Sequence, residues 1–117
     1  MYYIYMLRCK DNSIYTGITV NLEKRMNQHF TKSKQCAKYT LNHTPIKLEM
    51  VWTGENRSLA SKLEYQIKQL TKIQKENLIT LRDLEVYLSE KLTITDYSPM
   101  NIEDINRVQN NILHRQL

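Results

Sequence analysis

The sequence is poor in the residues that mark disordered, disulfide-bonded or zinc-binding chains. Its 117 residues include only two glycines and two prolines, too few for a low-complexity chain or for long linkers. The two cysteines, Cys9 and Cys36, stand alone, without a second thiol at C-x-x-C spacing, which argues against a zinc ribbon or a redox motif. We therefore expect reduced thiols in a cytoplasmic protein.

Long hydrophobic runs are missing as well. The apolar start of the chain ends at Arg8, which is too soon for a signal sequence or a membrane-spanning helix. A hydrophobic content of 41% over 117 residues fits one domain with a modest core. The 17 Lys and Arg exceed the 12 Asp and Glu, which gives a formal charge of +5. We therefore expect nucleic acid as the partner and no membrane association.

Three stretches of the chain predict β-strands. Tyr2–Cys9 and Ile14–Thr19 are rich in aromatic and β-branched residues, and the polar residues between them are typical of a turn. These two strands should form a hairpin. A third strand is expected at Lys47–Thr53, where large apolar residues alternate with charged ones.

The length of the hairpin loop decides whether two tyrosines can act together. A two-residue loop would separate Tyr5 from Tyr15, because a slip by one residue turns a whole strand to the opposite face. A three-residue loop would pair Leu7 with Tyr15 and make the two tyrosines diagonal neighbours on one face. That loop needs a left-handed residue at Asn12, which asparagine tolerates better than most residues. We predict the three-residue loop.

Two long helices are predicted to accompany these strands. Asn21 can cap the first, which should run to about Thr31, and Ser58 can cap the second. A short third helix is expected over residues 74–81. Beyond residue 81, leucine and isoleucine spacing indicates two further amphipathic helices, which could cover the core or form a homodimer.

The polar stretch over residues 32–44 has no clear period and predicts a surface loop. Its basic residues surround an aromatic ring, a combination that suits contact with a nucleic-acid backbone and stacking on a base. The candidate nucleic-acid-binding residues in this loop are Lys34, Lys38 and Tyr39.

Residues able to perform hydrolytic chemistry gather near the N-terminus. Tyr5 and Tyr15 can move a proton. Arg25 can neutralise phosphate charge. His29, one helical turn further on, can either move a proton or neutralise phosphate charge. These are parts of a phosphodiester-cleaving site, and Glu64, just off the apolar stripe of the second long helix, is the best candidate for a metal ligand.

These motifs, taken in order, resemble the GIY-YIG nuclease superfamily. The residues that carry the resemblance are Tyr3-Ile4-Tyr5, Tyr15-Thr16-Gly17, Arg25, His29 and Glu64. The resemblance runs from the N-terminus to about residue 80, and the segment 37–48 looks like the small, stand-alone, single-domain bacterial branch. Two departures stand out. Tyr3 replaces the first glycine of the family name, and Asn77 lies about one residue from the spacing of the family's frequent active-site asparagine.

The resemblance implies an α+β fold over residues 1–80, with a three-stranded antiparallel sheet flanked by helices, and leaves 81–117 as a helical C-terminal extension. It also implies an endonuclease that hydrolyses DNA phosphodiester bonds with one divalent cation, Mg²⁺ or Mn²⁺. The residues it assigns are the motif tyrosines Tyr5 and Tyr15, the structural glycine Gly17, the helix residues Arg25 and His29, and the metal ligand Glu64.

A mechanism follows from the charge that develops when water attacks a phosphodiester. Our hypothesis is that Tyr15, helped by Tyr5 or His29, accepts the proton of the water. Arg25 would hold the phosphate, and Glu64 would anchor the cation. An ordinary tyrosine, with a pKa of about 10, is a poor base at neutral pH, so a nearby positive charge must favour its phenolate.

Each of these residues also has an ordinary structural interpretation. The tyrosines could be half-buried strand residues, His29 a core histidine, and Arg25 and Glu64 solvated helix charges. Their occurrence together in the family's order favours the nuclease fold. Because a fold does not fix an activity, two alternatives stay open: a catalytically weak nucleic-acid-binding module, and an interaction protein that uses its C-terminal helices. No base-reading module is visible in the sequence, so we expect structure-selective rather than sequence-specific cleavage.

Overall fold

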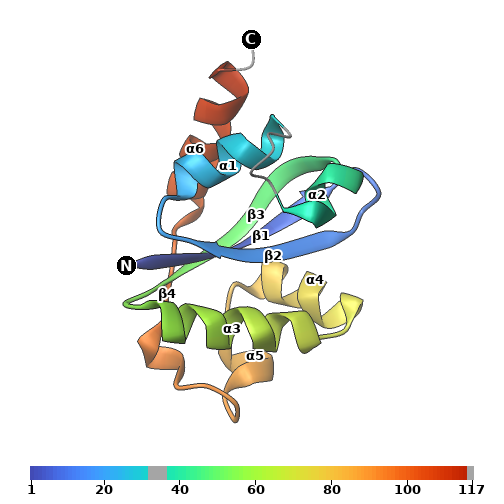
Figure 1. The fold of residues 1–117 in the computed structure, drawn as a ribbon. Coiled ribbons are helices and arrows are strands. Elements are labelled where there is room, and N and C mark those ends of the chain that lie inside the picture. The colour runs from blue at the N-terminus through green and yellow to red at the C-terminus, as the bar shows by residue number, and fades with distance from the viewer. Residues whose placement is uncertain (32–36, 116–117) are drawn as a thin grey trace.

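The computed structural model describes residues 1–31 and 37–115, which form a four-stranded antiparallel sheet with helices on both faces (Figure 1). The strands lie in the order β2, β1, β3, β4. Their bounds are β1 Tyr2–Cys9, β2 Ile14–Thr19, β3 Pro45–Gly54 and β4 Ser98–Pro99. The α+β class is confirmed, but the prediction of three strands was wrong. β4 escaped prediction because two residues at a proline, on the edge of a sheet, give no strand pattern.

The hairpin has the predicted register. Leu7 pairs with Tyr15, and Tyr5 pairs with Gly17. The loop closes where the amide of Asn12 donates to the carbonyl of Cys9 at 2.8 Å. Asn12 has a φ of 71°, the left-handed conformation that a three-residue loop requires.

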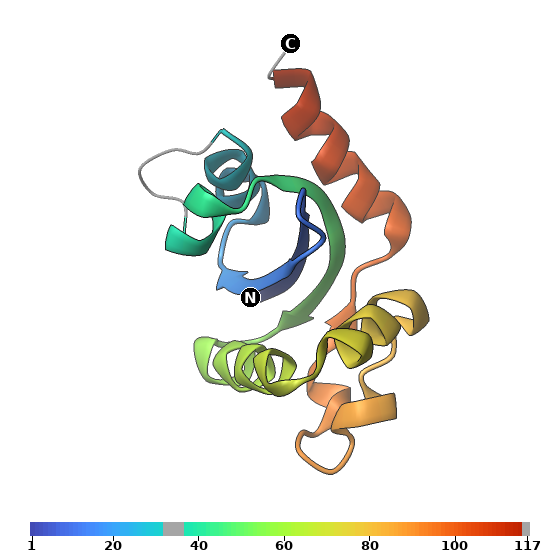
Figure 2. The same ribbon diagram turned by 90° about the vertical axis from the view of Figure 1, so that its right-hand side faces the viewer.

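The helices of the described chain cover the two faces of the sheet. Figure 1 shows α1 and α6 on one side, and α3, α4 and α5 on the other. Figure 2 shows β3 arching around β1 and β2, with α6 along the outer side of the arc. The bounds are α1 Leu22–Phe30, α2 Lys38–Asn42, α3 Arg57–Gln69, α4 Lys72–Leu81, α5 Glu85–Leu88, the 3₁₀ turn η1 Ile94–Asp96 and α6 Ile102–Arg115.

The ends of the predicted helices show which local signals decide. The side chain of Asn21 caps α1 by accepting from the amide of Lys24 at 3.0 Å, as predicted. The predicted cap of α3 was wrong, since Asn56 accepts from Leu59 at 2.9 Å and Ser58 lies inside the first turn. Asparagine and serine are about equally good caps, so the sequence could not choose between them.

The predicted loop over residues 32–44 was wrong for residues 38–42, which form α2. A helix this short has too few turns to show a period in the sequence. Residues 32–36, which include the predicted binding residue Lys34, lie outside the described residues.

The C-terminal extension packs against the sheet. Of its two predicted amphipathic helices, the second is α6, whereas the first shrinks to the single turn of α5. Ile105 and Ile112 of α6 are buried in the same core as the strands. The Gln109 side chain accepts a hydrogen bond from the amide of Leu48 at an irregularity of β3, and the Tyr97 hydroxyl donates to the carbonyl of Leu59 at 2.7 Å. A homodimer through these helices stays a prediction.

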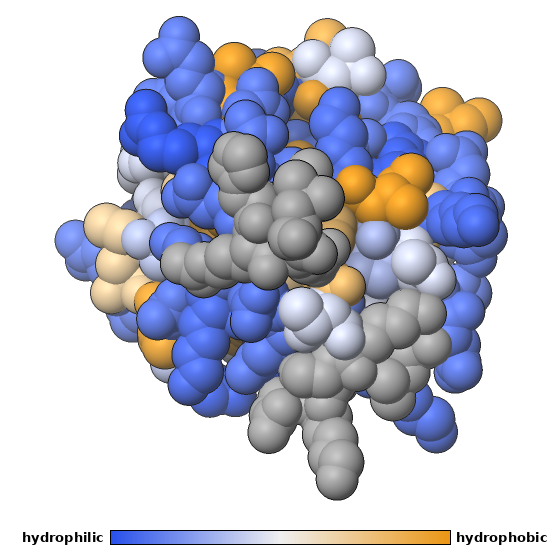
Figure 3. All heavy atoms as spheres, turned by 90° about the horizontal axis from the view of Figure 1, so that it is seen from above, coloured by the Kyte–Doolittle hydropathy of each residue, from blue (hydrophilic) through white to orange (hydrophobic). Residues whose placement is uncertain are grey.

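The surface seen from above is mainly hydrophilic, with small, separate apolar areas (Figure 3). Large exposed apolar residues such as Val20, Ile46 and Ile73 come from different parts of the chain, as is ordinary for a protein surface. In the ranges that the structure describes, the helices are all too short or too polar to cross a membrane.

Candidate active site

Two strand tyrosines form the floor of the candidate site. Tyr5 of β1 and Tyr15 of β2 share the face of the sheet that faces α1, with their ring centres 6.2 Å apart. Gly17 lies opposite Tyr5. A Cβ on Gly17 would stand 2.5 Å from the Tyr5 hydroxyl oxygen, closer than any real side chain approaches, so the ring of Tyr5 can lie here only because residue 17 has no side chain.

A hydrogen-bonded chain runs from Tyr5 into the protein. The Tyr5 hydroxyl lies 2.7 Å from Nε2 of His29 on α1, and Nδ1 of His29 lies 2.8 Å from Oγ1 of Thr40 on α2. The Thr40 hydroxyl donates to the carbonyl of Ala37 at 3.0 Å, so it accepts from His29. His29 therefore carries its proton on Nδ1, and Nε2 accepts from Tyr5.

The two members of this chain that can ionise are held neutral. His29 and Thr40 have no exposed surface, and Tyr5 is 1% exposed. Burial, with a smaller contribution from the charge of Arg25, lowers the pKa of His29 to about 4. Burial also raises the pKa of Tyr5 well above its ordinary value; nearby Tyr15 and Glu64 raise it further, whereas Arg25 lowers it.

An aromatic stack holds Tyr15 from the side of α2. The ring of Tyr39 stacks on Tyr15 with centres 5.6 Å apart, and the ring of His43 stacks on Tyr39 with centres 4.0 Å apart. His43 is fixed in turn by Asp11 of the hairpin loop, whose carboxylate lies 2.6 Å from Nδ1. Hydrogen bonds from Ser13, followed by that from His43, hold the pKa of Asp11 at about 2, so this anchor is ionised at neutral pH. In this arrangement the rings of Tyr15 and His43 both pack on Tyr39.

The charged residues approach from two helices. Arg25 of α1 donates to Gln28 at 2.8 Å, and its charge acts on both Tyr5 and His29. Glu64 of α3 lies at the edge of β2, where its charge acts on Tyr5. Its side chain is 23% exposed and pairs with Lys68 at 3.3 Å. The structure thus brings Tyr5, Tyr15, Gly17, Arg25, His29 and Glu64 together.

Comparison with known proteins gives the chain its family. The family model described as the GIY-YIG catalytic domain matches residues 1–77. The chain belongs to the GIY-YIG family. GIY-YIG domains are nuclease domains, and the predicted resemblance is confirmed.

Relatives of the chain are small proteins of the same family branch. UPF0213 protein FN1575 of Fusobacterium nucleatum is 46% identical over 70% of this chain and 80% of its own length. UPF0213 protein CPE1444 of Clostridium perfringens is 45% identical over 78% of this chain and 96% of its own length. The solution structure of UPF0213 protein BH0048 from Bacillus halodurans is 34% identical, covers 80% of this chain and 98% of its own, and has a TM-score of 0.47. These names state no activity.

The donor set of this GIY-YIG domain fits a lightly held divalent cation. The described residues contain no group of three or more His, Cys, Asp or Glu side chains that could together hold a metal ion. Glu64 is therefore the single candidate ligand from the described part of the chain. Mg²⁺ commonly binds through one or two carboxylates and completes its shell with water and substrate phosphate. Because Glu64 is partly exposed and already accommodates the ammonium of Lys68, the position fits a cation that binds together with the substrate.

Two further residues of interest lie on α4 and α2. The amide of Asn77 on α4 donates to the Tyr87 hydroxyl of α5 at 2.8 Å, so its side chain is engaged by the extension. Lys38 is exposed at the start of α2. The nucleic-acid-binding roles of Lys34, Lys38 and Tyr39 stay predictions.

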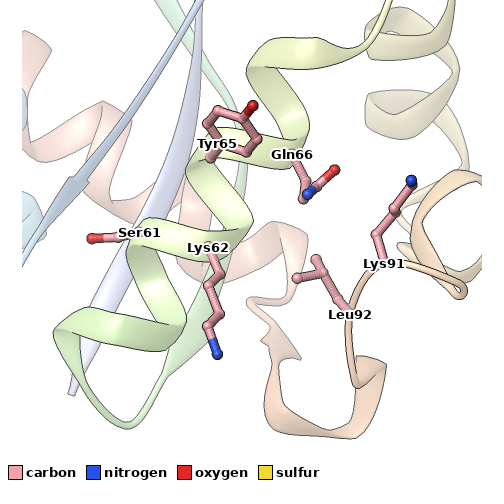
Figure 4. A pocket seen from close by; sticks show the side chains of 6 residues that line it. All are labelled: Ser61, Lys62, Tyr65, Gln66, Lys91 and Leu92. Atoms are coloured by element: carbon pink, nitrogen blue, oxygen red, sulfur yellow. The ribbon is translucent and has the colours of Figure 1, made fainter.

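A pocket of 290 Å³ lies on the outer side of α3 (Figure 4). Figure 4 shows side chains from α3 and from the segment after α5 around it. The lining residues are Ser61, Lys62, Tyr65, Gln66, Lys91 and Leu92. This set shares no residue with the tyrosine site.

Sequence reasoning missed four residues of the site. Thr40 accepts the hydrogen bond that fixes His29. Tyr39 and His43 form the aromatic stack on Tyr15, a role that was not predicted for Tyr39, and Asp11 anchors His43. Each acts through a partner distant in the chain, and threonine or histidine in a polar stretch gives no local signal. The resemblance of segment 37–48 to the small bacterial branch was the one feature that could have directed attention to α2.

Proposed function

We propose that this protein is a metal-dependent endonuclease that hydrolyses DNA phosphodiester bonds and selects DNA by structure rather than by sequence. One observation carries the proposal. The opposite charges of Arg25 and Glu64, from helices on two sides of the sheet, both act on the hydroxyl of Tyr5, beside Tyr15. A phosphate bound there would meet a guanidinium, a carboxylate able to hold a cation, and two phenols.

Tyr15 is the group that accepts the proton of the attacking water. Tyr5 is unsuited to that role because its raised pKa keeps it protonated, and its proton already lies on the bond to His29. His29 is a weak acceptor with a pKa of about 4. In contrast, no hydrogen bond joins the Tyr15 hydroxyl to another described residue, so this hydroxyl is free to contact water.

Tyr5 and His29 position the other participants. The fixed tautomer of His29 aims the Tyr5 proton away from the sheet surface, which leaves the oxygen lone pairs of Tyr5 able to accept from the attacking water or from Arg25. The ring of His29, 5.5 Å from that of Tyr15, also limits where Tyr15 can lie.

Arg25 and Glu64 manage the charge of the reaction. Arg25 binds the phosphoryl oxygens, whose negative charge grows as water attacks. Glu64 holds the divalent cation, which when bound would neutralise charge on the phosphoryl and leaving oxygens. Ionised Arg25 also favours an anionic phenol nearby, as its lowering effect on the pKa of Tyr5 illustrates.

The proposal of selection by DNA structure is supported by what the described chain contains. The sheet, its helices and the C-terminal extension account for residues 1–31 and 37–115. None of these described elements forms a separate base-reading module. A nick, flap, branch or single strand would present a phosphodiester to the site without base readout.

A substrate panel tests the function. The purified protein is incubated with labelled duplex, nicked, flapped, branched and single-stranded DNA, in Mg²⁺, Mn²⁺ or EDTA, beside a Glu64→Ala variant. We expect cutting of at least one substrate that needs metal and is lost in the variant. Binding of these DNAs without cutting by the wild-type protein, in both metals, would refute the nuclease and leave a nucleic-acid-binding module on the same scaffold.

A further inference from the structure

Three lysines lie close together near the β1–β2 hairpin. The ammonium of Lys68, at the end of α3, is 5.7 Å from the centre of the Tyr15 ring. Lys72, at the start of α4, donates to the carbonyl oxygen of Asn12 at the tip of the hairpin. Lys75 follows three residues later on the same face of α4. We call Lys68, Lys72 and Lys75 the lysine ridge.

The ridge carries more positive charge than its acidic neighbours neutralise. Lys68 pairs with Glu64 at 3.3 Å, and Lys72 pairs with Glu76 at 2.9 Å. Lys75 is half-buried, and within the described ranges no carboxylate lies at ion-pair distance from it. Burial lowers the pKa of Lys75, and the charges of Lys72 and Lys68 lower it further. The ammonium group of Lys75 therefore lies close enough to those of Lys72 and Lys68 to be repelled by both.

One of the two neutralising acids is also the candidate metal ligand. If a divalent cation bound Glu64, Lys68 would lose its acidic partner, and two of the three ridge lysines, Lys68 and Lys75, would then have none among the described residues. The electrostatic repulsion among the ammonium groups of the ridge would then be stronger, and an anion bound along the ridge would offset this repulsion. Metal and anionic substrate would thus favour each other's binding.

We propose that the lysine ridge binds the phosphodiester backbone of the DNA strand on the hairpin side of the cleavage site. The location of that cleavage site rests on the proposed function, whereas backbone binding does not need catalysis. A row of charges suits a polyanion better than a small anion. The ridge runs along the hairpin from the ring of Tyr15, which Lys68 contacts, to the carbonyl of Asn12, which Lys72 contacts, so its ammonium groups can each neutralise a phosphate of an extended backbone.

Binding measured without cleavage tests the ridge. Fluorescence anisotropy of labelled duplex in EDTA compares the wild type with a Lys68→Gln, Lys72→Gln, Lys75→Gln triple variant. Lys62→Gln is the matched control, because Lys62 is on α3 but lines the outer pocket. We expect the triple variant to bind about tenfold more weakly at 0.1 M salt, with a log-log salt slope smaller by about 0.9 for each phosphate that it no longer neutralises. Lys62→Gln should change neither quantity.

Two results would overturn the ridge: a triple variant with wild-type affinity and salt slope, or a Lys62→Gln control whose affinity falls as far. If thermal melting shows that the triple variant is unfolded, Lys75→Gln and Lys75→Arg replace it, and the ridge requires that glutamine weakens binding while arginine does not. Cleavage by the wild type with unchanged binding by the triple variant would keep the nuclease and reject the ridge. DNA binding that depends on the ridge lysines, in a wild-type protein that does not cleave, would support the ridge and reject the nuclease.

Discussion

The two sides of the candidate active site are built on different principles. On the α1 side, Tyr5, His29 and Thr40 are buried, neutral and joined by hydrogen bonds of 2.7 and 2.8 Å. On the α3 side, Glu64 and Lys68 are partly exposed and joined by an ion pair of 3.3 Å. We call these the neutral side and the ionic side.

The difference indicates which parts of the site are fixed before substrate arrives. In a buried hydrogen-bonded chain, every member left unpaired costs free energy, so the chain has one favourable arrangement. An exposed ion pair contributes little and can exchange partners. The neutral side therefore sets the geometry of the phenols, and under the proposed function the ionic side is the part that cation and DNA would complete.

Tyr15 contacts both sides, through His29 on the neutral side and Lys68 on the ionic side. Removal of its hydroxyl should have the largest effect on cleavage. Tyr15→Phe keeps the ring that packs on Tyr39 and His29 but removes the proposed proton acceptor. Cleavage should fall by about 10²- to 10⁴-fold, with DNA affinity and melting temperature unchanged. Tyr65→Phe, at a tyrosine that is 60% exposed, is the control and should cut normally. A Tyr15→Phe protein that cuts within a few-fold of wild type would remove Tyr15 from the mechanism.

The neutral side should also make the protein sensitive to acid. His29 has a pKa of about 4 in the folded protein against an ordinary 6.5, so between these values the unfolded chain binds a proton that the folded chain does not. His29 therefore does not lower the free energy of unfolding above pH 6.5, but it lowers this free energy by about 3 kcal/mol as the pH drops to 4.

Urea unfolding at a series of pH values measures this loss. A His29→Gln variant, which has no imidazole at this position, should be less stable at pH 7.5 but should lose less stability between pH 6.5 and 4. The same pH slope in both proteins would show that other groups cause the acid sensitivity.

A third test asks how tightly the neutral side is packed. Gly17→Ala would place a methyl group 2.5 Å from the Tyr5 hydroxyl oxygen, and Tyr5 cannot yield easily because it is buried and bonded to His29. We expect a loss of about 1–3 kcal/mol in the free energy of unfolding. Gly54→Ala is the matched control, since its new methyl would meet atoms no nearer than 3.6 Å. Equal losses at both positions would mean that the space around Tyr5 adapts.

Sequence alone could predict the parts of the fold that depend on neighbours in the chain. The register of the hairpin followed from one loop residue, Asn12, whose left-handed backbone decides which face Tyr5 and Tyr15 share. The cap of α1 at Asn21 likewise needs only its own first turn. Such features carry their cause within a few residues.

The parts that sequence could not predict depend on distant partners. β4 exists because Ser98 and Pro99 meet the edge of β3, and nothing near them in the chain indicates a strand. Thr40 matters only because His29, eleven residues earlier, turns Nδ1 toward it. The residues of the candidate site were therefore visible in the sequence, whereas the side chains that hold them in place were not.

Thr40 offers the finest test of the comparison between the two sides. Thr40→Val keeps the shape but removes the hydroxyl, so Nδ1 of His29 loses its acceptor while remaining buried. We expect a loss of about 1–2 kcal/mol in stability and a several-fold slower cleavage, because the tautomer that orients Tyr5 is no longer fixed. Nitrogen chemical shifts of the His29 ring report that tautomer directly.

Thr40→Ser separates the hydrogen bond from packing. Serine keeps the hydroxyl and loses only the methyl group, so the His29 tautomer and the cleavage rate should stay as in the wild type, with a smaller loss of stability than in Thr40→Val. If serine and valine slow cleavage equally, the methyl group rather than the hydrogen bond positions α2. The neutral side would then owe its rigidity to packing, and the contrast with the ionic side would be one of burial alone.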